Sequence, residues 1–223
     1  MIITRKIKWN SPQLRRVPKG LFMSILKKII KPYNCTIAFG IPISCDEWCD
    51  ERKNSIKGDR FAKSRFTKKF FIPNQYKQQV VEPYNKTIGL VPKELELKVI
   101  TGLTLDKYTQ AISSEQRMVF ILFSHWDGEN IEFFDEFYNS EKLAQQIPNK
   151  KIIDICACRP ENLAQAIKKT RSDCFVQRSD QELIPAYWLH YYVTFFRYLR
   201  DEELTYLLAV EKTVEFMLRA SKS

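Results

Sequence analysis

One histidine and one cysteine each come directly after an apolar run that is typical of a buried strand. His125 follows residues 118–124 (MVFILFS), and Cys158 follows residues 151–157 (KIIDICA). The two lie 33 positions apart, which leaves room for one crossover between parallel strands. Because parallel strands end at the same edge of a sheet, we expect the two side chains to face each other there.

A thiol next to an imidazole can carry out nucleophilic catalysis. An unperturbed cysteine has a pKa of about 8.5 and is mostly protonated at neutral pH, so it gains reactivity when an imidazole accepts its proton. The imidazole can then protonate a leaving amine. Cys156 competes with Cys158 as the nucleophile, but the position at the strand end, followed by Arg159, favours Cys158. We expect Cys156 to lie in the core.

The segments around both residues resemble the two signature segments of caspase-like cysteine peptidases. VFILFSHWDGE resembles the strand that ends in Ser-His-Gly in this family, and IIDICACRPE resembles the later strand that ends in Ala-Cys-Arg. The order strand, helix, strand before the histidine and the Phe- and Tyr-rich helices after the cysteine are most similar to the bacterial CHAT branch. The resemblance covers residues 35–219.

This resemblance implies a cysteine endopeptidase that works through a thioester acyl-enzyme and needs no cofactor. It implies His125 as the acid/base, Cys158 as the nucleophile, and the backbone N–H groups of Cys158 and Trp126 as the oxyanion hole. Trp126 stands where the family usually has glycine. It further implies a protein or peptide substrate, an activating protein partner, and regulated proteolysis in a bacterial antiviral defence or cell-death system.

Two acidic residues flank the predicted strand at 174–177, where this fold builds the pocket for the substrate residue before the scissile bond. Asp173 and Asp180 are therefore candidates for an acidic pocket that accepts Arg or Lys. Cys45 and Cys49 have the spacing of metal ligands, but zinc usually takes four ligands and the two histidines have other positions, so we expect no metal.

The distribution of charge gives an alternative function from another class. Residues 1–110 carry 22 Lys and Arg against 9 Asp and Glu, while residues 111–223 carry 14 against 17. The run RFAKSRFTKKFF at 60–71 interleaves cations with aromatic rings, which can bind phosphates and stack on bases. The alternative is a catalytically silent caspase-like module that binds nucleic acid or a protein partner through its basic N-terminal half.

The elements that must position the pair follow from the hydrophobic pattern. Apolar runs predict strands at 35–43, 95–101, 118–124, 151–157 and 174–177, and apolar residues at helical spacing predict helices between and after them. The helices are expected at 21–30, 74–87, 105–112, 140–146, 161–170, 182–199 and 202–219. This alternation predicts an α/β fold, a caspase-like three-layer sandwich with a mostly parallel sheet and helices on both faces.

The chain is expected to divide into a basic segment at 1–34 with a short helix and a peptidase domain at 35–223, which carries a basic insertion at about 45–73. The N-terminus lacks the apolar run of a signal peptide, and no apolar stretch is long enough to span a membrane. Six unevenly spaced cysteines favour reduced thiols and a cytoplasmic protein. His190, among aromatic residues of a predicted helix, is expected to serve packing.

Overall fold

The computed structural model describes residues 25–44, 76–90, 95–125, 130–149, 151–157, 160–178 and 185–220. Its main feature is a five-stranded sheet in the order β2-β1-β3-β6-β7, in which every neighbouring pair is parallel. The strands are β1 (Cys35–Phe39), β2 (Lys98–Ile100), β3 (Val119–Phe123), β6 (Ile152–Cys156) and β7 (Phe175–Arg178). The predicted α/β class with a mostly parallel sheet is confirmed.

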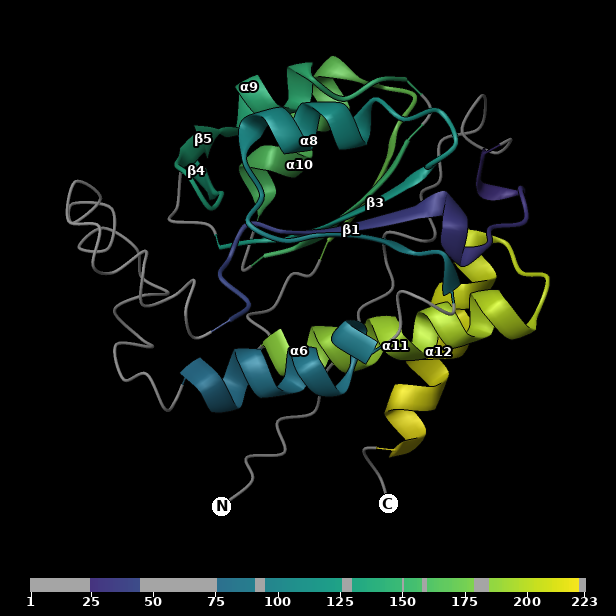
Figure 1. Cartoon of the computed structure of the whole chain (residues 1–223). Helices are drawn as coiled ribbons and strands as arrows, with labels where there is room; N and C mark the ends of the chain where they lie inside the picture. The colour runs from purple at the N-terminus through teal and green to yellow at the C-terminus, as the bar shows by residue number, and fades with distance from the viewer. Residues whose placement is uncertain are drawn as a thin grey trace.

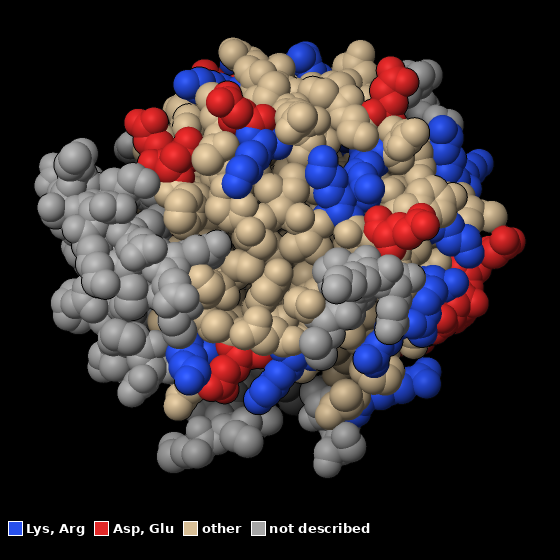
Figure 2. All heavy atoms as spheres, viewed as in Figure 1, with Lys and Arg blue, Asp and Glu red and all other residues tan. Residues whose placement is uncertain are grey.

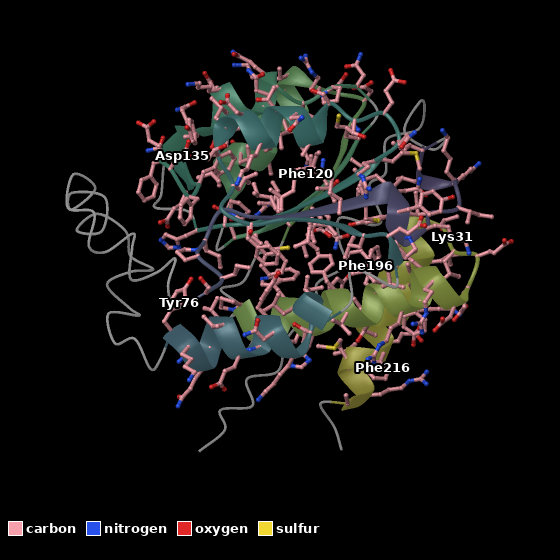
Figure 3. All side chains as sticks on the ribbon, viewed as in Figure 1. Lys31, Tyr76, Phe120, Asp135, Phe196 and Phe216 are labelled. Carbon is pink, nitrogen blue, oxygen red and sulfur yellow. The ribbon has the colours of Figure 1, made fainter. Side chains whose placement is uncertain are left out.

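The three central strands are buried along their whole length, because helices cover both faces of the sheet. In β1, β3 and β6 every residue is buried, which is why these strands read as continuous apolar runs in the sequence. Figure 1 shows one layer of helices above the sheet and a second layer below it. Figure 3 labels Phe120 and Phe196, which lie on opposite sides of the sheet.

The upper layer consists of α8 (Leu105–Ile112), α9 (Ser140–Gln145) and α10 (Glu161–Thr170). Side-chain caps fix where the first two begin: the Thr104 side chain accepts a hydrogen bond from Lys107 N, and the Asn139 side chain accepts one from Glu141 N. The apolar faces of these helices pack on alternate residues of the strands, including Phe120 and Leu122 of β3.

The lower layer consists of α11 (Pro185–Asp201), α12 (Tyr206–Ala220) and the shorter α6 (Glu82–Lys86), which continues a π-helical segment, η4 (Lys77–Val81). It packs against the other face of the strands, including Val119, Ile121 and Phe123 of β3. The 3-10 segments η2 (Pro32–Asn34) and η5 (Ile88–Leu90) complete the described elements on this side.

The start of the described chain differs from the predicted helix at 21–30. Residues 25 and 26 are helical, but Ile29 forms an antiparallel bridge with Thr205, and Ile30 N donates a hydrogen bond to Leu204 O. The segment therefore packs against the turn before α12 as part of the lower core, with Ile25 and Leu26 buried there. The predicted insertion at 45–73 lies outside the described residues.

A small hairpin that the hydrophobic pattern did not predict follows β3. Strands β4 (Asn130–Glu132) and β5 (Phe137–Asn139) pair in antiparallel fashion and form their own two-stranded sheet. The hairpin lies beside the carboxyl ends of the parallel strands, toward the left of Figure 1. In the part of the chain that the structure describes, no helix has the length and apolar character needed to cross a membrane.

Candidate active site

The carboxyl ends of β3 and β6 lie next to each other in a defined register. Phe123 of β3 pairs with Cys156 of β6, and Ser124 N donates a hydrogen bond to Cys156 O at 3.3 Å, one residue beyond the end of β3. The next residue along the first strand is His125, and the next along the second is Ala157. This register is the geometric frame of the candidate site.

The β4 strand fixes the backbone of His125. Its carbonyl oxygen accepts a hydrogen bond from Glu132 N at 2.8 Å and another from Ser124 Oγ at 3.2 Å. The histidine is only 8% exposed. These two bonds and the burial hold the backbone of His125 at the sheet edge.

Three chain segments approach so closely at this edge that one position requires glycine. Gly40, just after β1, donates its N–H to Phe123 O at 2.8 Å. A Cβ atom added to Gly40 would lie 2.3 Å from Glu132 O and 3.2 Å from Ser124 Oγ. The single proton of the Ser124 hydroxyl is shared between His125 O and Glu132 O. These contacts hold three segments together around His125: the loop after β1, the end of β3 and strand β4.

Glu132 is a buried acid beside this frame that sequence reasoning missed. It is 3% exposed, and its neighbours Ile131 and Phe133 are both fully buried apolar residues of the upper core. A single carboxylate between two core side chains is the signal that would have drawn attention to it. Its backbone makes the bonds to His125 and Ser124 described above.

The environment of Cys156 makes it a poor nucleophile. It is 4% exposed, and its thiol donates a hydrogen bond to the Tyr192 hydroxyl at 3.3 Å. Burial, and to a lesser degree the charge of Asp154, raises the pKa of the Cys156 thiol well above its ordinary value. Cys156 is a core residue, as predicted, and this removes the competing candidate for the nucleophile.

The structure does not bring all the predicted site residues together. Cys158, Trp126 and Asp180 lie outside the described residues, as do Cys45 and Cys49. The prediction for Asp173 is wrong. This residue precedes β7, and Phe175 N donates to Lys151 O at the start of β6, so Asp173 lies at the amino edge of the sheet.

A four-residue strand separates that edge from the carboxyl edge by about 13 Å. Asp173 therefore cannot line a pocket beside His125. The prediction for His190 also needs correction. It lies in α11 as expected, but its side chain is exposed and does not contribute to the packing of the lower layer.

Comparison with known proteins adds no family to this picture. No protein-family model matches the chain, and no curated protein matches its sequence.

Proposed function

We propose that the chain is a cysteine endopeptidase of the caspase-like type in which His125 and Cys158 form the catalytic pair. The observation that carries the proposal is the register of β3 and β6, in which Phe123 pairs with Cys156. His125 and Cys158 each come two residues after one member of that pair. Because each residue lies two positions beyond the register pair on adjacent parallel strands, we expect the imidazole and the thiol to lie close together.

The alternation of side chains supports the same pairing. Val119, Ile121 and Phe123 of β3 pack in the lower core, and so do Ile152 and Cys156 of β6. Side chains two residues apart on a strand share a face, so the side chains of Phe123 and Cys156, from which the two members of the pair follow, lie on the same side of the sheet. The inert, buried thiol of Cys156 leaves Cys158 as the nucleophile at this edge.

The proposed reaction has two steps. His125 accepts the proton of the Cys158 thiol, and the thiolate attacks the substrate carbonyl carbon to form a tetrahedral oxyanion, which the backbone N–H groups of Cys158 and Trp126 stabilise. The C–N bond then breaks, His125 gives its proton to the leaving amine, and a thioester remains. Water, deprotonated by His125, hydrolyses the thioester and restores the thiol.

The remaining parts of the proposal concern partners and location. A protein or peptide substrate follows from the reaction, and the resemblance to CHAT peptidases suggests an activating protein partner and regulated proteolysis in bacterial defence or cell death. Cys35 and Cys156 are free thiols, which favours a reducing compartment such as the cytoplasm.

The silent binding module remains the second candidate because the N-terminal half is strongly basic. Its run at 60–71 lies outside the described residues. Figure 2 shows Lys and Arg interspersed with Asp and Glu on the described part of the face in view, rather than gathered in one positive patch. A module of this class would bind nucleic acid with an affinity that falls steeply as salt rises.

Peptide cleavage tests the proposal directly. Incubation of a proteome-derived peptide library with the wild type, with Cys158→Ala and with His125→Ala, followed by mass-spectrometric mapping of new N-termini, reads out cleavage without a known substrate. We expect new termini with a common residue before the cut in the wild type and in neither variant. The same set of termini in all three proteins would refute the proposal.

A further inference from the structure

A cluster of polar side chains, four buried and one half-buried, lies against β6 from the middle of the strand to its carboxyl end, on the side of the lower helices. We name it the Asp154 cluster, after the carboxylate at its centre. Its members come from four elements: Asp154 and Cys156 of β6, Gln177 of β7, Tyr192 of α11 and Tyr206 of α12. Nothing in the proposed peptidase reaction uses these groups.

Asp154 is held by side chains but not fully satisfied. It is 1% exposed, and its Oδ2 accepts a hydrogen bond from Tyr206 OH at 2.9 Å and one from Gln177 Nε2 at 3.4 Å. Its Oδ1 has no hydrogen-bond partner among the described residues. Burial raises the pKa of Asp154 to about 6, against the opposing effect of the Tyr192 and Tyr206 hydroxyls.

Tyr192 contacts the ends of both strands that lead to the proposed pair. Its ring meets the ring of Phe123 edge to face, with the centroids 5.7 Å apart, and its hydroxyl accepts the hydrogen bond from Cys156. Phe123 and Cys156 are register partners, and each stands two residues before His125 or Cys158. Tyr192 thus contacts the last register pair of β3 and β6 from the side of the lower helices.

The groups that face Asp154 hold their protons through the physiological pH range. Burial first, and then the negative charge of Asp154, raises the pKa values of the neighbouring thiol and hydroxyls well above their ordinary range; these groups are Cys156, Tyr191, Tyr192 and Tyr206. Of the other titratable groups of this part of α11, Tyr187 is half-buried and His190 is exposed. Asp154 is therefore the member of the cluster that changes its charge between pH 5 and 8.

A buried acid with this environment destabilises the fold, so its place in the middle of an apolar strand calls for a reason. The contacts supply one, because Asp154 joins the middle of β6 to β7 and α12, and Cys156 joins its carboxyl end, where the proposed site begins, to α11. We propose that Asp154 and Tyr192 are positioning residues, which hold the ends of β3 and β6 at the separation that His125 and Cys158 require. This inference rests on the proposed function.

Protonation of Asp154 should change this arrangement. The ionised carboxylate receives charge-assisted hydrogen bonds from Tyr206 and Gln177, which are roughly twice as strong as neutral ones. When the proton binds, these two bonds weaken, and the cost of burying a charge is removed. The geometry around the end of β6 should therefore differ between the two sides of pH 6.

The first test measures the second-order rate constant for alkylation of Cys158 by iodoacetamide at pH 7, read site by site by mass spectrometry. Tyr192→Phe keeps the ring and removes the hydroxyl. We expect the His125-dependent part of the rate to fall roughly tenfold, as for one buried hydrogen bond. Tyr108→Phe is the matched control. Tyr108 is 3% exposed, and its hydroxyl donates a hydrogen bond to Leu143 O at 3.2 Å in the upper layer.

The second test does not depend on the proposed pair. In a His125→Ala protein, the amide ¹H and ¹⁵N resonances of residues 156–158 should shift with a midpoint near pH 6, and the further change Asp154→Asn should abolish that shift. Resonances that do not shift with the ionisation of Asp154 would overturn the positioning role. An equal loss of alkylation rate in Tyr192→Phe and Tyr108→Phe would overturn it as well. If the wild type shows no His125-dependent alkylation, the proposed function fails, and the resonances alone decide the role of Asp154.

Discussion

Replacement of Asp154 by asparagine should change how stability depends on pH, by an amount that follows from the structure. Burial raises the pKa of Asp154 from 3.8 to about 6 in the folded protein. The folded state therefore binds the proton more tightly than the unfolded state. The stability that this proton contributes is fully present below about pH 4 and is lost as the pH rises through 6.

The size of the effect follows from the two pKa values. A difference of about two pKa units corresponds to roughly 3 kcal/mol, most of which appears between pH 4 and pH 8. Asparagine has the same shape and does not titrate. Its amide N–H groups add a cost, but that cost is the same at every pH. The stability of Asp154→Asn relative to wild type should therefore rise by about 2 to 3 kcal/mol from pH 4 to pH 8.

Urea unfolding monitored by tryptophan fluorescence at a series of pH values measures this difference. Every other titrating group contributes equally to both proteins, so only the change in the difference matters. We expect the separation between the two unfolding midpoints to change by roughly 1 M urea over this pH range. Stability curves that run parallel from pH 4 to pH 8 would show that Asp154 does not titrate as argued.

Three further predictions follow from the described contacts. Gly40→Ala places a Cβ atom against Glu132 O, and urea unfolding should show a loss of about 1 to 3 kcal/mol; unchanged stability would contradict the tight packing around His125. Lys151→Met leaves two backbone carbonyls without their buried donor and should cost about 2 to 4 kcal/mol, whereas Lys28→Met at an exposed position should cost little. Cys156 should resist iodoacetamide in the native protein and react once urea unfolds it, which mass spectrometry of the alkylated peptides can check.

Much of the fold could be predicted because the central strands are buried on both faces. The runs at 118–124 and 151–157 contain β3 and β6, and the helices predicted at 105–112 and 161–170 match α8 and α10. The hydrophobic pattern does not predict the β4–β5 hairpin, because each strand has only three residues, too few for alternation to appear.

The errors at single residues have physical reasons as well. Aromatic residues surround His190 in sequence, which favours a packing role, yet Thr194 and Arg197 follow it at helical spacing and are also not buried, so the three form the outer stripe of α11. The pocket expected at Asp173 fails because β7 runs parallel to β6, so a residue before β7 lies at the amino edge of the sheet. Burial of Asp154 beside two tyrosines distant in sequence is a tertiary property that no local pattern reveals.

The central claim is that His125 activates Cys158, and the pH dependence of Cys158 alkylation tests it most directly. The rate constants are measured from pH 5 to pH 9 with iodoacetamide, peptide by peptide, for the wild type and for His125→Ala. We predict rapid reaction of Cys158 below pH 7 in the wild type and slower reaction in the variant, with an apparent pKa near that of a free thiol. An ordinary thiol titration of Cys158 in both proteins would contradict the account.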